Sequence, residues 1–478
     1  MRQDINEVKK VLDKYGYSIN NIICDVMKIF KFKTLCWKVG MVKNDGYSAS
    51  EIITLMILFP LMLLKSVHAF YESQFKMVAD MKKDTIYRLK NNEKMPWRRL
   101  LYGVAKKFQE LVNPNKEVAP NSAFIVDDTI DDRIGYKMEN ISIVHDHVAK
   151  RSTYGFKNLV LGHFDGTSIS PLDFSLHSEK ALNRKKKKMQ YKKECLKNSN
   201  GSKRRAECKV DKITGALSLI RRAVKNGFKA KYVLVDSWFT SIDFIKDIRK
   251  IKDGEMHVVA GIRNDFRKYS YRDESLNAKQ LIKKLSAEGN QKRCRQWNVR
   301  YFEVTVYYEG VGDVKLYMCR FPYQKKWRVF ISTDTTLTFV KMMEIYSIRW
   351  TIEVMFRELK QHLQLGRCQS QDFDAQIASA TVSMILYVFL SYFRRMNAYE
   401  TLGALFEVIK EDVYEKNLAQ RLWGLFDELL QVVIDIISQS GKIDIESFRK
   451  SAEYQYLREL YETSFLSNQM FEINNKSA

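Results

Sequence analysis

Three acidic residues stand at positions where the local sequence pattern could arrange them for metal-dependent chemistry. Asp128 follows a short apolar run at 124–126, and Asp236 follows the run at 232–235. In α/β sheets, ligands bind beyond the carboxyl ends of strands, and a carboxylate there is held by a rigid element. Two such carboxylates repel each other unless a cation lies between them, and Mg²⁺ prefers oxygen ligands. A single acid at a strand end can equally cap the following helix, so each aspartate alone leaves both interpretations open.

The third candidate, Glu353, belongs to a segment that the apolar spacing predicts to be one long helix from Leu337 to about Leu363. At about 100° per residue, its face is shared by one tyrosine and three cations, namely Tyr346, Arg349, Arg357 and Lys360. This pattern could be a stripe of salt bridges between neighbouring turns. It could also place one metal-binding acid among cations that hold phosphates, for which the planar guanidinium of arginine is well suited.

The elements that must position these acids indicate an α/β fold. Stretches at 157–164 and 168–176 are predicted to be adjacent antiparallel strands joined by a turn at Asp165-Gly166. The run at 232–235, a helix from Ser241 to about Ile251 and a strand at 257–262 predict a parallel βαβ unit. Residues 263 to about 335 alternate in polarity and are predicted to form a β-rich insertion.

The charge of the chain favours a polyanionic partner. With 80 Lys and Arg against 56 Asp and Glu, the net charge is +24, and cations that neutralise phosphates release condensed counterions. Between Arg184 and Arg205, eleven basic residues accompany one acid, Glu194. This tract is either a solvated disordered segment or a loop that clamps a phosphate backbone. Its Asn198–Ser202 stretch is typical of a flexible loop.

Other features exclude several classes of protein. The seven cysteines are scattered, without C-x-x-C or zinc-finger spacing, which suits free thiols in a reducing compartment. The apolar run at 52–64 is short for a membrane span and contains Pro60, so a buried helix is expected. No sign of a signal peptide or of an RNA-recognition motif is seen. We expect a cytoplasmic protein that associates with the bacterial nucleoid when bound to DNA.

The spacing Tyr346-x2-Arg349-x3-Glu353-x6-Lys360 resembles the signature of insertion-sequence transposases of the IS-four type. The segments 126–129 and 233–236 resemble the blocks that carry the first and second acids of that family. The resemblance covers roughly residues 120 to 395. It implies an RNase H-like catalytic core and three metal ligands, Asp128, Asp236 and Glu353. Asp128 is preferred because it precedes Thr129, and Asp127 is the alternative.

The same resemblance implies a DNA transposase that cuts the ends of an insertion sequence and joins them to target DNA. It implies two Mg²⁺ ions, with Mn²⁺ able to substitute, and a homodimer that holds double-stranded DNA ends with terminal inverted repeats. Related transposases free the second strand through a hairpin, and Trp327 stands where they carry an aromatic residue for base stacking. An ordinary core tryptophan is the competing interpretation.

The predicted organisation has four parts. Residues 1–120 form a helical N-terminal DNA-binding region, and 121–262 with 336–395 form the catalytic core. Residues 263–335 are the β-rich insertion, and 396–478 are a helical region suited to dimerisation. Two rival functions remain: a structure-selective nuclease with an RNase H-like core, and an inactive or domesticated transposase that only binds DNA.

Overall fold

The structure is a computed structural model that describes residues 22–73, 81–146, 149–263, 265–322, 324–397 and 401–408, with a few isolated positions beyond them. Contacts divide the chain into two units, and one of these spans Ile23–Val408. The features described below lie within that unit.

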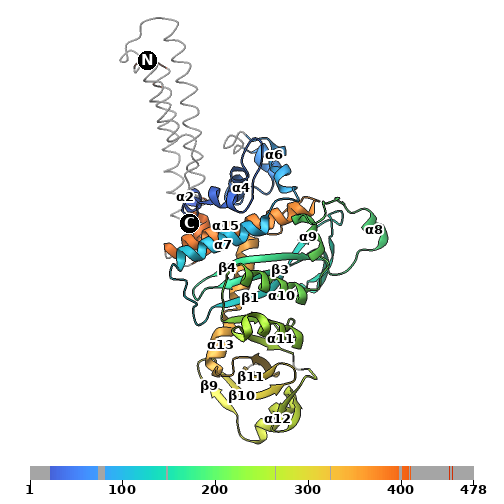
Figure 1. Ribbon diagram of the computed structural model, residues 1–478, viewed down its shortest axis with the longest axis vertical. Helices are drawn as coiled ribbons and strands as arrows, with labels where there is room; N and C mark the ends of the chain where they lie inside the picture. Colours follow the sequence, from blue (N-terminus) through green and yellow to red (C-terminus); the bar gives the residue numbers. More distant parts are fainter. Residues whose placement is uncertain are drawn as a thin grey trace. The chain divides into compact units, whose positions relative to one another are not determined.

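A large mixed sheet forms the centre of the unit (Figure 1). Its main path runs in the order β2-β3-β1-β5-β6-β12-β11-β10-β7-β8, with β4 added to β3 and β9 added to β10. The strands are β1 (Ala123–Arg133), β2 (Ser142–Asp146), β3 (Arg151–Phe164), β4 (Ile169–His177), β5 (Tyr232–Val235), β6 (His257–Ile262), β7 (Lys268–Tyr271), β8 (Glu274–Asn277), β9 (Lys292–Cys294), β10 (Val299–Tyr308), β11 (Gly312–Arg320) and β12 (Arg328–Ser332).

The pairing of the first strands confirms two expectations from the sequence. β3 and β4 are antiparallel and are joined by the turn at Asp165-Gly166. β5 and β6 are parallel and are connected through α11 (Ile242–Lys250). β1 lies between the two groups, antiparallel to β3 and parallel to β5. Residues 123–126 of β1 and all residues of β5 are buried, which fixes both strands in the middle of the sheet.

Helices cover both faces of this part of the sheet. α10 (Lys212–Lys225) packs on β3 from one side, where its Gly215 lies against Leu159. α14 (Trp350–Gln361) packs from the other side, where its Ile352 approaches Gly162. Since successive side chains of a strand point to opposite faces, even-numbered residues of β1 face α10 and odd-numbered residues face α14.

The N-terminal part of the unit is helical, as expected. Its helices are α2 (Ile22–Ile29), α3 (Phe32–Lys38), α4 (Ala49–Leu58), α5 (Val67–Glu72), α6 (Lys83–Lys90) and α7 (Trp97–Val112). The apolar run at 52–64 contributes mainly to α4, most of whose residues are buried. α7 packs against β4 and against the long helix α15 (Phe373–Met396).

α15 is long and apolar enough to cross a membrane by length and composition, but 94% of its most apolar window is buried inside the protein. α15 packs against α4 and α7, and both Ser50 of α4 and Phe389 of α15 are buried. The apolar surface of α15 is therefore covered within this unit. Among the described residues, no other helix meets the same criteria.

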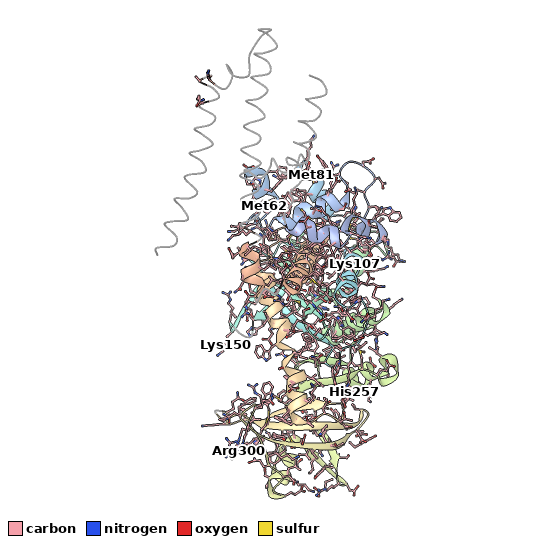
Figure 2. All side chains as sticks on the ribbon, turned by 90° about the vertical axis from the view of Figure 1, so that its left-hand side faces the viewer. Met62, Met81, Lys107, Lys150, His257 and Arg300 are labelled. Atoms are coloured by element: carbon pink, nitrogen blue, oxygen red, sulfur yellow. The ribbon has the colours of Figure 1, made fainter. Side chains whose placement is uncertain are left out.

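Residues 263–335 are rich in strands, as predicted, but they also contain a helix, α12 (Ala278–Ala287). Their last strand, β12, pairs with β6, so the strands of this stretch extend the same sheet. Figure 2 shows this continuation from His257 on β6 to Arg300 on β10.

The prediction of one helix from Leu337 to Leu363 was wrong. The chain forms α13 (Phe339–Ser347) and α14, separated at Ile348-Arg349. Backbone bonds there join residues three apart, from Ile348 to Ile345 and from Arg349 to Tyr346. Such 3₁₀ geometry turns more per residue than an α-helix, so Tyr346 does not keep the angular position calculated for a single helix. Residues 1–21 of the predicted N-terminal region, and most of the predicted C-terminal region 396–478, lie outside the described residues.

Candidate functional site: an acidic cluster around Arg349

The register of two parallel strands brings Asp127 and Asp236 side by side. Ala123 pairs with Tyr232 and Ile125 with Leu234, so Asp127 and Asp236 occupy equivalent positions just past this ladder. Residues at equivalent positions of neighbouring strands point to the same face of the sheet. Both carboxylates therefore lie at the carboxyl edge of the sheet, on the face covered by α14.

Arg349 connects this pair with the third acid. Its Nη1 atom donates to Asp127 Oδ2 at 2.9 Å, and its Nη2 atom donates to Glu353 Oε1 at 2.7 Å. The side chains of Asp127 and Arg349 are 17% and 11% exposed, whereas that of Glu353 is 36% exposed. One guanidinium thus lies between Asp127 and Glu353, and solvent reaches Glu353.

The pKa of the Asp127 carboxyl is shifted first by burial and then by the charges around it. Burial raises the pKa of the Asp127 carboxyl to about 7, and the negative charges of Asp236 and Asp128 add to the shift. Arg349 and the backbone N–H of Asp128 act in the opposite direction without cancelling it. A further cation at this place would be favoured because it would relieve the repulsion among the acids.

Asp128, the preferred first acid of the sequence analysis, points to the opposite face of β1. Its Oδ1 atom accepts a hydrogen bond from Lys212 of α10 at 3.1 Å, and Lys157 lies 3.8 Å from Oδ2. The physical reason is the alternation of the strand, which places Val126 and Asp128 on the α10 side. Asp127, the alternative, is the one of the two that lies on the face of Arg349.

The other residues that were predicted from the sequence do not all lie beside the acids. Tyr346 is half-buried and its hydroxyl lies above Gly261 of β6, where a Cβ would be 3.3 Å away. Lys360 donates to the carbonyl of Ile130 on β1 at 2.7 Å, and Arg357 is exposed to solvent. Thus Tyr346 and Arg349 lie at the acids, whereas Lys360 lies farther along β1.

Trp327 directly precedes β12 and is half-buried. Its ring packs on Phe302 with 5.2 Å between the ring centroids, and the guanidinium of Arg320 lies 5.1 Å from the ring centroid of Trp327.

A different tryptophan, Trp238, lies beside the acids and was not predicted from the sequence. The backbone N–H of Trp238 donates to Asp236 Oδ1 at 2.8 Å, and its exposed ring lies 4.2 Å from Lys212 Nζ. An exposed aromatic two residues after a strand-end acid was the signal available in the sequence.

The basic tract at 184–205 divides into two kinds of cation. Arg205 forms ion pairs with Glu139 at 2.7 Å and Asp374 at 2.9 Å, and Lys193 pairs with Asp374 at 2.8 Å. These side chains hold the tract against the core. In contrast, four cations of α8 (Arg184–Lys188) are exposed, namely Arg184, Lys185, Lys187 and Lys188. The tract is therefore neither wholly disordered nor wholly available to a ligand.

The residues present suit a divalent cation, although their arrangement leaves it no ready-made cage. In the part of the chain that the structure describes, no three acidic, histidine or cysteine side chains are grouped closely enough to hold one metal ion. The guanidinium of Arg349 occupies the space between Asp127 and Glu353. The donor set of three carboxylates nevertheless fits Mg²⁺, which takes oxygen ligands and keeps positions for water and phosphate. Asp127, Asp236 and Glu353 would hold it once Arg349 turned towards a phosphate.

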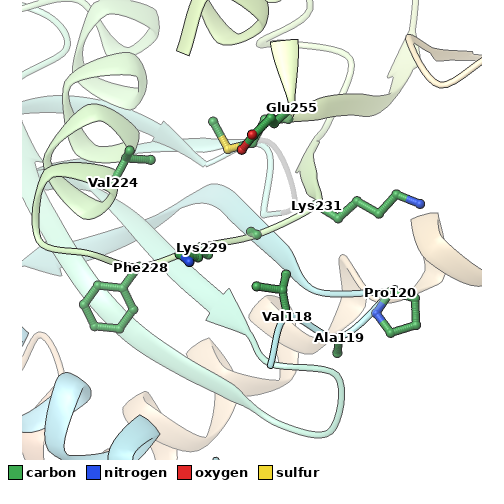
Figure 3. A pocket seen from close by; sticks show the side chains of 10 residues that line it. Val118, Ala119, Pro120, Val224, Phe228, Lys229, Lys231 and Glu255 are labelled. Atoms are coloured by element: carbon green, nitrogen blue, oxygen red, sulfur yellow. The ribbon is translucent and has the colours of Figure 1, made fainter. Parts of the chain in front are cut away.

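A cavity of about 340 Å³ lies at the opposite edge of the sheet, beside the starts of β1, β5 and β6 (Figure 3). It is lined by Pro120, Phe228, Lys231 and Glu255, among others. Because it lies at the amino ends of these strands, it is separate from the acidic cluster at their carboxyl ends.

One comparison with known proteins found a match. No curated protein matches the chain. Residues 164–389 match the model of the family described as transposase DDE domain. The matched segment contains Asp236, Arg349 and Glu353, whereas Asp127 precedes it. Residues 164–389 of this chain are therefore similar to the transposase DDE domain.

Proposed function

We propose that the protein is a DNA transposase of the IS-four type that cleaves the ends of an insertion sequence and joins them to target DNA. The observation that carries this proposal is that Asp127 and Asp236 lie side by side at one edge of the sheet, where Arg349 bonds both Asp127 and Glu353. An RNase H-like core is part of the proposal, supported by the strand order β4-β3-β1-β5-β6 with only the last three strands parallel.

The three carboxylates would hold two Mg²⁺ ions, with Mn²⁺ able to substitute. When bound, such ions activate the attacking oxygen and stabilise the leaving oxygen of a phosphodiester displacement. Arg349 can exchange its carboxylate partners for the phosphate under attack, because its planar donors fit either group. Tyr346, above Gly261, then orients the same phosphate from the side of β6.

The chain's own contribution is mainly positioning and charge. Asp127 and Asp236 are fixed by two buried strands, so little reorganisation is needed when the phosphate arrives. Water attacks first and frees a 3′-hydroxyl at the end of the element. That hydroxyl then attacks a phosphodiester of target DNA in line with the leaving oxygen, so one P–O bond forms as another breaks.

Opening of the second strand through a hairpin is a finer part of the proposal. A hairpin requires a terminal base to leave the stack, and an aromatic ring can receive it. Trp327 is half-buried against Phe302, and Trp238 is exposed beside Asp236. Both rings are therefore candidates for this contact.

The decisive experiment uses the full chain, Mg²⁺ and a duplex that carries the inverted repeats beside its gene. The wild-type protein should release a 3′-hydroxyl end and join it to a plasmid. Glu353→Gln should abolish both reactions while DNA binding is retained, because the substitution removes a ligand charge without changing side-chain size. Cleavage without joining would instead identify a nuclease, and full activity of Glu353→Gln would remove the basis of the proposal.

A further inference from the structure

A second functional surface lies along β1, beyond the acidic cluster. It is a groove of about 1,370 Å³ formed by the end of β1, the turn that leads to β2, the start of β3 and the connection between α14 and α15. Five cationic side chains line it against two acidic ones; the cations are Arg133, Lys137, Arg151, Lys360 and Arg367. They come from four separate segments of the chain, so the fold and not a local sequence run gathers them.

Two of these cations build the wall of the groove. Arg133 donates through Nη1 to the carbonyl of Gly366 at 2.5 Å and through Nη2 to Gln376 at 2.8 Å. Lys360 donates to the carbonyl of Ile130. These bonds tie the end of β1 to α14 and to the connection that follows it. The groove is therefore held open by hydrogen bonds between elements that are distant in sequence.

The other three cations are available to a ligand. Lys137, Arg151 and Arg367 are exposed, and no carboxylate among the described residues forms an ion pair with them. Of the two acids, Asp131 is buried in the floor and accepts a hydrogen bond from Asn158 at 3.1 Å. The other acid, Asp132, is exposed. The groove therefore presents three exposed cations against one exposed acid, and this positive excess suits a phosphate backbone.

Helix α8 extends this basic surface. Lys186 of α8 donates to the hydroxyl of Tyr154 at 2.6 Å and lies 5.5 Å from the ring centroid of Tyr136. Both tyrosines line the groove. The contact fixes α8 at the rim, where its exposed cations continue the positive charge of the groove.

The distance from the acids suits a duplex that passes through both places. Six residues of β1 separate Asp127 from Arg133, which corresponds to about 20 Å at roughly 3.3 Å per residue. That is the length of about six base pairs of DNA. A duplex whose backbone lies in the groove can therefore present a phosphodiester at the acidic cluster.

The opposite side of the cluster has a different chemistry. The loops after β5 and β6 carry two exposed aromatic residues, Trp238 and Phe266. Arg267 donates to the carbonyl of Thr240 at 2.7 Å, so the two loops are joined. Exposed aromatic rings suit the unpaired bases of a DNA end, whereas isolated cations suit the phosphates of an intact duplex. Joining requires two DNA molecules to meet at the acids, one from each side.

We propose that the groove lined by Lys137, Arg151 and Arg367 binds the backbone of the intact target duplex, while the element's end approaches from the side of Trp238 and Phe266. This inference rests on the proposed function, because it assigns the second substrate of the same reaction.

The test uses Lys137→Glu/Arg151→Glu/Arg367→Glu in the full chain. Hydrolytic nicking is measured on the duplex with inverted repeats, and joining is measured with a pre-cut end bearing a 3′-hydroxyl and a supercoiled plasmid. The matched control is Lys106→Glu/Lys116→Glu/Lys225→Glu, which makes the same change of charge with exposed residues at the opposite edge of the sheet. Circular dichroism checks that both variants fold.

We expect the groove variant to nick at a rate within about twofold of wild type and to join at least tenfold less product, while the control joins normally. An equal loss of nicking and joining would place the element's end, and not the target, in the groove. Unchanged joining, or an equal loss of joining in the control, would also overturn the inference. If the wild-type protein neither nicks nor joins, the proposed function itself has failed, which is a distinguishable result.

Discussion

Two clusters of acids and arginines lie on opposite faces of the same sheet, and they differ in the balance of charge. On the α14 face, Asp127 and Glu353 share the single guanidinium of Arg349, and Asp236 adds a third negative charge beside Asp127. On the α10 face, Asp173 of β4 is fully buried among three guanidinium groups, those of Arg98, Arg204 and Arg222. The first cluster has an excess of acids, whereas the second has three guanidinium groups for two acids, Asp173 and Glu207.

This difference appears in the pKa values of the two aspartates. Burial raises the pKa of Asp127 to about 7, and its acidic neighbours add to the shift. Burial also acts on Asp173, but the three arginines, with Arg98 foremost, hold its pKa at about 2. The same residue types therefore form a site that favours binding of a further cation around Asp127. Around Asp173 they form a structural cluster whose acidic charge is already balanced.

The largest expected effect concerns which aspartate of the pair 127–128 carries the reaction. Asp127→Asn should lower the rate of end cleavage on the order of 10⁴-fold, because a lost metal ligand removes several kcal/mol of charge stabilisation and each 1.36 kcal/mol is tenfold in rate. Asp128→Asn should retain most activity, since Asp128 pairs with Lys212 on the other face. Single-turnover cleavage measures both. Equal losses of cleavage activity in the two variants would show that the face of the sheet on which an aspartate lies does not decide which aspartate binds the metal.

The second prediction concerns the cluster around Asp173. Asp173→Asn should lower the free energy of unfolding by about 3 kcal/mol, because it removes one of the two carboxylates, Asp173 and Glu207, that balance three partly buried guanidinium groups. Denaturant unfolding measures the change. Tyr102→Phe, which removes one hydrogen bond to Asp173, is a milder variant that should cost about 1 kcal/mol. No loss of stability in either variant would mean that the cluster does not join α7, β4 and α10 as the contacts indicate.

The third prediction is a pH dependence of stability. The pKa of Asp173 is lower in the folded protein, about 2, than its ordinary value of 3.8. Its contribution is therefore present above about pH 4 and is lost as the pH falls towards 2, by about 2 kcal/mol at 1.36 kcal/mol per pKa unit. Unfolding measured at several acidic pH values should show this loss in the wild type. A profile of equal steepness in Asp173→Asn would assign the acid sensitivity to other carboxylates.

The sequence was sufficient to predict the two buried strands that lead to Asp127 and Asp236. The runs at 124–126 and 232–235 are long enough and apolar enough to predict buried strands, and these strands are present. The choice between Asp127 and Asp128 required the register of β1 with β5 and the identity of the helix on each face. Those are properties of chain segments about a hundred residues apart, which local periodicity does not contain.

The break between α13 and α14 could not be predicted for a related reason. Residues 345–352 contain neither proline nor glycine, and their apolar spacing continues through the break. Tertiary contacts determine it instead. Phe330 packs edge-on against Tyr346 at 4.8 Å on one side, and Arg349 binds Asp127 on the other. The same applies to the basic tract, whose ion pairs with Glu139 and Asp374 depend on residues far away in sequence.

The smallest expected effect separates cations that are already paired from those that are exposed. Replacing the exposed cations of α8, Arg184, Lys185, Lys187 and Lys188, with alanine should reduce the slope of log affinity against log salt by about 2–4, at roughly 0.9 per phosphate contact. Arg205→Gln should leave that slope unchanged and instead lower stability, because Arg205 is paired with Glu139 and Asp374. Fluorescence anisotropy with a short labelled duplex at increasing KCl measures the slope. A reduced slope in Arg205→Gln, with no change after the α8 substitutions, would reverse the roles given to the two halves of the tract. The distinction matters because both halves look alike as sequence, and only the acids around them decide which cations remain available to DNA.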